Sequence, residues 1–155
     1  MYKIRKARED ELLKVAGMWK EFMRYNGEFN RSFETNRKAS EIFSREMLEK
    51  LKEPESHLAV AESDGELIGF CYSYISQKPK YFKLEKFGFI GDLFVIPEYR
   101  RNGIGRALVN DAVDFFGKRK IKQIELLVAK KNENTIKFWE SLGFNHLLTW
   151  MYKRN

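Results

Sequence analysis

The chain has 155 residues, 43% of them hydrophobic, which predicts one globular domain with its own hydrophobic core and excludes a disordered protein. Its lone cysteine, Cys71, excludes an intrachain disulfide framework and suits a reducing cytoplasm, and the absence of a long apolar run argues against export or membrane spanning. The formal charge of +7 favours an anionic partner, which can be a nucleic acid, an anionic lipid or a phosphate-rich cofactor.

The first 56 residues predict a strand followed by two helices. Residues 2–6 alternate weakly, as a strand does, and apolar residues then recur every three or four positions from Leu12 to Met23, which predicts an amphipathic helix. A second helix is expected over residues 40–52. The polar loop between the helices, residues 26–38, is either anchored on the core or a lid that faces the substrate.

Residues 57–96 predict antiparallel strands. Two apolar segments, residues 57–62 and 66–75, flank Ser63-Asp64-Gly65, and the Asp-Gly pair is a strong hairpin signal. Residues 77–86 are polar and include four lysines, so they should form an exposed loop. A further strand is expected over residues 87–96.

Residues 97–145 predict a turn, a helix, a strand at 122–129 and a short helix at 132–142. A strand, helix, strand order requires a crossover, so the strands at 87–96 and 122–129 should be parallel. Residues 146–155 are expected to add a terminal strand. The predicted fold class is therefore mixed α/β (α+β): a single domain, residues 1–155, with a central mixed sheet of about six to seven strands and about four helices.

The turn before the helix at 104 has the features of an anion-binding site. Gly103 and Gly105 let an anion approach the backbone, where the first N–H groups of the helix and the positive end of its dipole point. A P-loop is absent, and the third glycine of a dinucleotide fingerprint is replaced by Leu108. We interpret the turn as the binding site for the pyrophosphate of a cofactor. No metal site is expected, since His57 and His146 lack cysteine neighbours at ligand spacing.

Four segments of the sequence carry a resemblance to a known family. Arg100-Arg-Asn-Gly-Ile-Gly105 matches the pattern Arg/Gln-x-x-Gly-x-Gly/Ala. It is preceded by Asp92-Leu-Phe-Val-Ile-Pro-Glu-Tyr and followed by Leu127-Val-Ala-Lys-Lys-Asn132 and Ile136-Lys-Phe-Trp-Glu-Ser-Leu-Gly-Phe144. Together these motifs resemble the cofactor half of the GNAT superfamily of acyl-CoA N-acyltransferases over residues 87–145, and the elements before it follow the family's order more loosely.

The resemblance implies acetyl-CoA as co-substrate, no metal, and two parallel strands that splay apart to admit the pantetheine arm. For Asn132 and Trp139 the structural alternatives are a helix N-cap and core packing, and either role can coexist with cofactor binding. The implied cofactor-binding residues are Leu93, Phe94, Val95, Arg100, Arg101, Asn102, Gly103, Ile104, Gly105, Arg106, Asn132 and Trp139.

The resemblance also implies catalytic roles, and here the chain departs from the family. The glutamate that often serves as base is replaced by Gly91, so the candidate bases are Asp92 next to it and Glu125 on the facing strand. A shift of one residue turns a side chain to the other face unless a bulge intervenes. Trp139 stands where many relatives have tyrosine, and an indole cannot protonate the leaving thiolate, so Tyr74 or Tyr152 substitutes or the thiolate leaves unassisted. A backbone N–H near Phe94 or Val95 is the expected oxyanion donor.

The function that the resemblance implies is transfer of an acetyl group to a primary amine by direct attack in a ternary complex. The acceptor would be a polyamine- or aminoglycoside-like small molecule or a protein amino group, with Glu28 and Glu34 as substrate-binding residues. We expect a cytoplasmic enzyme, able to form a homodimer, without nucleic-acid or membrane partners. The alternatives are a catalytically weak acyl-CoA-binding or regulatory module, suggested by Gly91 and Trp139, and a basic nucleic-acid-binding protein.

Overall fold

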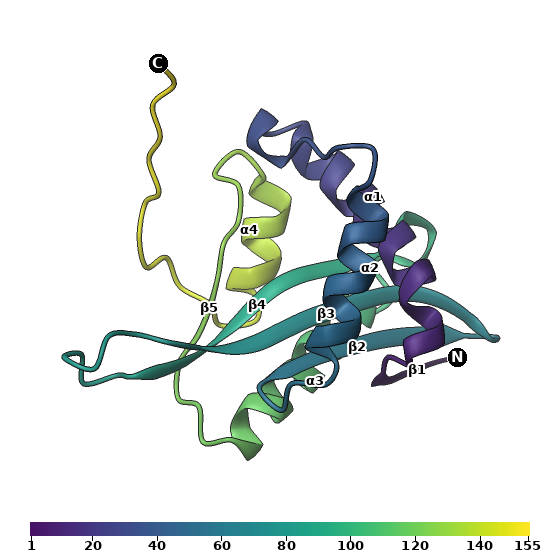
Figure 1. Ribbon diagram of the computed structural model, residues 1–155, viewed down its shortest axis with the longest axis horizontal. Helices are drawn as coiled ribbons and strands as arrows, with labels where there is room; N and C mark the ends of the chain where they lie inside the picture. The colour runs from purple at the N-terminus through teal and green to yellow at the C-terminus, as the bar shows by residue number, and fades with distance from the viewer.

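The computed structural model describes residues 1–155 as a mixed sheet with helices packed against it (Figure 1). The strands are β1 (Tyr2–Lys6), β2 (Ser56–Ser63), β3 (Glu66–Gln77), β4 (Lys86–Val95) and β5 (Ile124–Leu126). The α-helices are α1 (Leu12–Gly27), α2 (Ala39–Lys50), α3 (Ile104–Lys118) and α4 (Glu133–Glu140). The mixed α/β class and the four helices are confirmed, and none of the helices is long and apolar enough to cross a membrane.

The five strands lie in the order β1-β2-β3-β4-β5. The first four pair antiparallel, whereas β4 and β5 are parallel, as the strand, helix, strand pattern predicts. The parallel pairing is short, because only Gly88–Ile90 pairs with Ile124–Leu126. Beyond these residues β4 continues alone to Val95, so that half of its edge has no strand neighbour on the β5 side.

The sheet has five strands, fewer than the six to seven expected. The difference lies near the C-terminus, where the strand expected over 122–129 shrinks to Ile124–Leu126 and residues 146–155 form no strand. The backbone of residues 145–155 makes no hydrogen bond to other backbone groups. A strand requires a hydrogen-bonded neighbour, which a pattern of apolar residues cannot supply.

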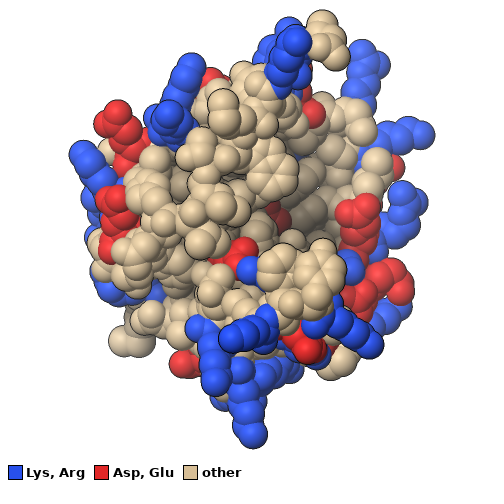
Figure 2. Space-filling view, turned by 90° about the vertical axis from the view of Figure 1, so that its left-hand side faces the viewer, with Lys and Arg blue, Asp and Glu red and all other residues tan.

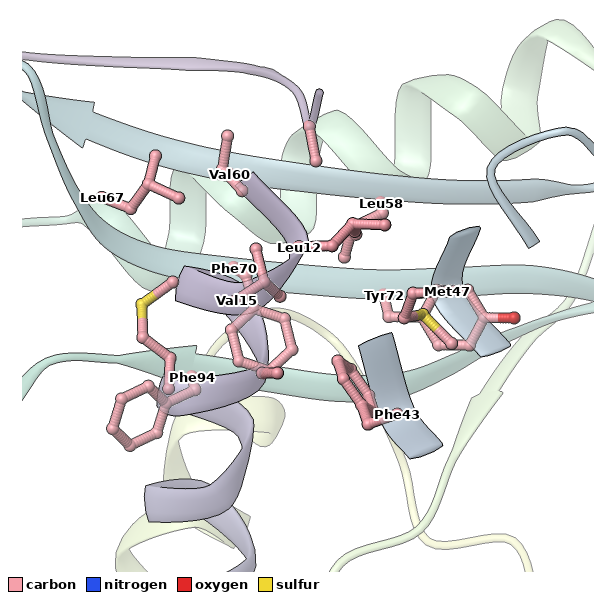
Figure 3. Packing of buried hydrophobic residues seen from close by; sticks show 13 residues of the cluster. Leu12, Val15, Phe43, Met47, Leu58, Val60, Leu67, Phe70, Tyr72 and Phe94 are labelled. Atoms are coloured by element: carbon pink, nitrogen blue, oxygen red, sulfur yellow. The ribbon is translucent and has the colours of Figure 1, made fainter. Parts of the chain in front are cut away.

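Hydrophobic cores lie on both faces of the sheet, and we name the faces after the helices that cover them. On the α1/α2 face, Val15 and Phe43 pack against strand residues such as Phe70 (Figure 3). On the α3/α4 face, Leu108, Phe116 and Trp139 pack with strand residues that include Cys71. Cys71 is fully buried and burial raises the pKa of its thiol, so it is packed in the core and unsuited to act as a nucleophile.

A β-bulge in β4 changes the face to which its side chains point. The pairing between β3 and β4 passes from Tyr72 opposite Asp92 to Ser73 opposite Ile90, which leaves Gly91 without a partner. Ile90 packs on the α3/α4 face, whereas Phe94, an even number of residues further on, packs on the α1/α2 face. Since side chains two residues apart share a face, Asp92 lies on the same face as Phe94.

Candidate functional site

The turn between β4 and α3 presents a set of free backbone N–H groups. Arg101 and Gly103 both adopt the left-handed conformation, with φ of 66° and 78°, and Gly103 is the N-cap of α3. The N–H groups of residues 101–106 donate to no backbone carbonyl, and no side chain caps the helix. Free N–H groups at the positive end of a helix dipole form a site for an anion such as a phosphate.

The three arginines of the turn differ in their surroundings. Arg100 donates through Nε to the carbonyl oxygen of Val95 at 2.8 Å, and its guanidinium lies 5.6 Å from the ring centroid of Phe94. Its charge is thereby turned back toward β4. Arg101 and Arg106 are exposed and form no ion pair, so they are the positive charges available to an anion at the start of α3.

The start of α3 packs directly on α4. A Cβ atom at Gly105 would lie 3.3 Å from Cζ of Phe138, closer than ordinary van der Waals contact allows. Asn132 caps α4 by accepting the N–H of Thr135 at 3.2 Å, and Trp139 is 7% exposed in the α3/α4 core. The structure thus gives Asn132 and Trp139 the roles of helix N-cap and core residue.

The two candidate bases have different environments. Glu125 accepts hydrogen bonds from Lys78 at 3.1 Å and from Gln123 at 2.7 Å. Asp92 has no hydrogen bond or ion pair within the chain, and burial raises the pKa of its carboxyl group to about 6. A carboxyl group with a pKa near neutral and no partner is suited to accept a proton, because its charge is not already neutralised.

Two tyrosines of β3 border the bulge. A Cβ atom on Gly91 would lie 3.3 Å from the ring of Tyr72 and 3.5 Å from the ring of Tyr74. Burial raises the pKa of both phenols, and the charge of Asp92 raises that of Tyr74 further. Sequence reasoning named Tyr74 but missed Tyr72, although the spacing of Phe70, Tyr72 and Tyr74 on one strand indicates that all three share a face.

A cavity of about 660 Å³ opens on the α1/α2 face beside these tyrosines. Its lining includes four glutamates and two basic residues from α2, β2, β3 and the connection between α2 and β2. The lining residues are Arg45, Glu46, Met47, Glu49, Lys50, Glu53, Glu55, Ser56, Tyr72, Tyr74 and Ile75. Figure 2 views the end of the molecule that carries the β3–β4 hairpin and shows a hollow bordered mostly by uncharged side chains, with acidic atoms beside it.

Three residues predicted for the site do not line this cavity. Glu28 and Glu34 are exposed and face Arg24 at 3.7 Å and Arg31 at 3.1 Å, respectively, and neither lines the cavity beside Tyr72 and Tyr74. Glu34 instead borders a smaller cavity of about 270 Å³ between α1 and α2. Tyr152 is 68% exposed in the segment after α4.

The chain resembles known proteins in sequence and in structure. Residues 18–144, most of the chain, match the sequence model of the "Acetyltransferase (GNAT) family". An uncharacterized N-acetyltransferase of Methanocaldococcus jannaschii is 30% identical over 146 residues, which are 92% of this chain but 60% of that protein. The chain therefore spans less than two thirds of the length of this relative.

Two solved structures resemble the whole chain. A "predicted acetyltransferase with acetyl-CoA" from Clostridium acetobutylicum has a TM-score of 0.81 and 20% identity, covering 99% of this chain and 96% of its own. The aminoglycoside acetyltransferase AAC(6')-Iy, in complex with a bisubstrate analogue, has a TM-score of 0.80 and 18% identity, covering 100% of this chain and 98% of its own. At these identities the likeness shows a shared fold.

Proposed function

Since the chain belongs to the GNAT family of acetyltransferases, we propose that it transfers an acetyl group from acetyl-CoA to a primary amine and that Asp92 is the base. The observation that carries this proposal is the carboxyl group of Asp92. It has no partner within the chain, its pKa is raised to about 6 by burial, and it lies just beyond the point where β4 and β5 cease to pair.

The free N–H groups of residues 101–106 support acetyl-CoA as the co-substrate, because they fit the pyrophosphate of CoA. Arg101 and Arg106 would add positive charge there. The unpaired edge of β4 over residues 93–95 would bond the pantetheine arm, and the N–H groups near Phe94 and Val95 would hold the developing oxyanion. When bound, acetyl-CoA supplies the acetyl group as an activated thioester.

We place the acceptor amine in the cavity on the α1/α2 face. An alkylamine with a pKa of about 10 is mostly protonated at neutral pH, so a base must remove a proton before attack. The bulge at Gly91 directs Asp92 to the face where the cavity opens. Of the four glutamates of the lining, Glu49, Glu53 and Glu55 pair with lysines, whereas Glu46 forms no ion pair and is the carboxylate available to a cationic small molecule of the polyamine or aminoglycoside kind.

Tyr74 is our candidate for the group that protonates the departing thiolate. It shares a face with Asp92, and its raised pKa keeps the phenol protonated at neutral pH. Tyr152 does not meet these conditions, because it lies exposed in the segment after α4. Glu125 is likewise set aside as the base, since Lys78 and Gln123 already bind its carboxylate.

The proposal is tested by measuring CoA thiol release from acetyl-CoA with a diamine, a polyamine, an aminoglycoside and a peptide with a free N-terminus. We expect turnover on at least one cationic small molecule and a loss of about 10²–10⁴-fold in kcat for Asp92→Asn, with CoA affinity unchanged. Asp114→Asn, a change of the same kind at an exposed position of α3, should keep full activity. Tight CoA binding without turnover on any amine would instead favour a catalytically weak acyl-CoA-binding module.

A further inference from the structure

The hairpin formed by β3 and β4 ends in a turn, residues 79–84, which we call the hairpin tip and which projects beyond the helices (Figure 1). The N–H of Lys78 donates to the carbonyl oxygen of Glu85 at 2.7 Å, and the N–H of Phe82 donates to that of Pro79 at 3.0 Å. None of the tip residues lines either of the two cavities described above. The hairpin tip is therefore a hydrogen-bonded turn that stands apart from the proposed acceptor site.

Two aromatic side chains lie exposed at the hairpin tip. Tyr81 is 83% exposed and Phe82 is 49% exposed, and their ring centroids are 4.9 Å apart. Leu84 adds a third apolar side chain, which is partly exposed. Large apolar side chains that gather in water on a projecting hairpin indicate a surface that binds another molecule or a membrane.

The lysines of the hairpin differ in whether their charge is neutralised. The two lysines at the base of the hairpin, Lys78 and Lys86, form ion pairs with glutamates at 3.1 and 3.0 Å. Lys80 and Lys83, on either side of the two aromatic residues, are exposed and form no ion pair. Glu85 is the only acidic residue between positions 77 and 86. The hairpin tip thus combines apolar side chains with free positive charge.

A second group of free lysines lies at the same end of the sheet. Lys118, Lys120 and Lys122 are exposed and form no ion pair. The segment that carries them leads to the base of the hairpin, because the N–H of Gly88 in β4 donates to the carbonyl oxygen of Gln123 at 2.8 Å. Figure 2, which faces this end of the molecule, shows lysines and arginines gathered along the lower edge.

We propose that the hairpin tip and the free lysines near its base bind the surface of a lipid bilayer that carries anionic headgroups. Tyr81 and Phe82 enter the boundary between headgroups and acyl chains, where aromatic side chains are favoured. The free lysines lie at the level of the headgroups, where each strengthens binding on the order of fivefold. Because only the tip enters the bilayer, the contact is weak and reversible.

The geometry favours a bilayer over a single-stranded nucleic acid. Proteins that bind single strands use a basic groove in which successive bases stack on separate aromatic rings. Here the rings of Tyr81 and Phe82 pack against each other on a projecting turn, and neither lines a described cavity. The sequence predicted no membrane partner because no segment can span a bilayer, but a peripheral contact does not require such a segment.

Cosedimentation of the full chain with vesicles tests the proposal. At low ionic strength we expect vesicles of phosphatidylcholine with about 30% phosphatidylserine to bind the protein at least tenfold more tightly than phosphatidylcholine alone. Salt at about 0.5 M should remove most of this preference, because it screens the lysines. The assay needs neither acetyl-CoA nor an amine, so its outcome is independent of the proposed function.

Two double variants separate the contributions of the rings and the charges. Tyr81→Ser, Phe82→Ser should weaken binding to anionic vesicles at least tenfold, because the apolar anchors are lost. Lys80→Gln, Lys83→Gln should weaken it on the order of tenfold or more and leave binding to neutral vesicles unchanged. The tip residues belong to neither hydrophobic core, so both variants should keep the thermal midpoint of the wild type.

The matched control is Leu13→Ser, Lys20→Gln, which removes an exposed apolar side chain and an exposed lysine from α1 and should bind as the wild type does. The proposal is wrong if the wild type binds anionic vesicles no better than neutral ones. It is also wrong if the variant without Tyr81 and Phe82 binds anionic vesicles as tightly as the wild type, because another surface then makes the contact. Binding of single-stranded RNA that is lost in the two tip variants, without binding of vesicles, would assign the tip to a nucleic acid instead.

Discussion

Asp92 shows how one residue couples stability and chemistry. Its carboxyl group is desolvated without a compensating hydrogen bond or cation, which raises the pKa to about 6. Glu125, also a strand carboxylate, is neutralised by Lys78 and hydrogen-bonded by Gln123. Of these two carboxylates, only Asp92 lacks a hydrogen bond and an ion pair within the chain.

The pKa of Asp92 predicts a pH profile. The ionised form accepts the proton, so kcat/KM should rise as pH increases through about 6. In Asp92→Asn this limb should disappear, which a rate profile between about pH 5 and 9 would detect. If the variant kept both the rate and the limb near pH 6, Asp92 would not be the base.

The same shift predicts a change in stability. The folded-state pKa of about 6 lies above the value of about 3.9 in an unfolded chain, so ionised Asp92 destabilises the fold above about pH 6, and this cost is absent below about pH 4. Asp92→Asn should therefore raise the free energy of unfolding by roughly 1–3 kcal/mol at pH 8 and leave it unchanged at pH 4. Denaturant titrations at the two pH values would check this, and an equal effect at both would contradict the role of burial.

Gly103 is the residue on which the anion site depends most directly. Its φ of 78° strains any side chain, so Gly103→Val should distort the free N–H groups and weaken CoA binding at least tenfold in calorimetry. Gly65→Val is the matched control, because Gly65 has a similar φ of 82° in the β2–β3 hairpin. It should carry a similar cost in stability and leave CoA affinity intact. Equal losses of affinity in both variants would mean that global destabilisation is the cause.

At the scale of elements, the site depends on a bulge and on a helix contact. The bulge at Gly91 directs Asp92 to the α1/α2 face. Because Gly105 has no side chain, the start of α3 can approach Phe138 of α4. Neither glycine contributes a side chain to the site. Each affects the site by setting where a neighbouring residue or helix lies.

Gly105→Val tests the contact between α3 and α4. The added atoms would overlap Phe138, and the variant should lose about 1–3 kcal/mol of stability and bind CoA more weakly, because the ends of both helices shift. Gly117→Ala, at a position on α3 with open space around it, should instead gain up to about 1 kcal/mol. Thermal unfolding with and without CoA measures both effects. Unchanged CoA affinity in Gly105→Val would mean that this contact does not shape the cofactor site.

At the scale of the molecule, two cores share one sheet. Trp19 packs on the α1/α2 face and Trp139 on the α3/α4 face, and both faces are built on β2, β3 and β4. We propose on this ground that residues 1–155 unfold as a single domain.

Fluorescence tests this proposal. In variants that retain only Trp19 or only Trp139, the denaturation midpoints should coincide at a fixed protein concentration. Phe70→Ala and Phe116→Ala, one in each core, should each cost about 3–5 kcal/mol and shift both probes together. A midpoint that moved for one probe alone would show that the two faces unfold separately.

The sequence by itself determined the helices, the antiparallel strands, the parallel crossover and the glycine-rich turn before α3. These features rest on apolar periodicity, turn residues and helix termini, and such signals act over a few residues. The same signals predict a strand around Leu148 and Trp150. A strand also needs a hydrogen-bonded neighbouring strand, and residues 145–155 have none.

Only the tertiary structure decided the environments of the candidate site. Lys78 lies 47 residues from Glu125 in the chain and neutralises it, and Tyr72 and Tyr74 reach Gly91 from the neighbouring strand. The bulge that turns Asp92 toward them is a matter of register between β3 and β4. Register, burial and charge neighbours arise from pairing between distant segments, and a pKa depends on all three, so the distinction between Asp92 and Glu125 required the folded chain.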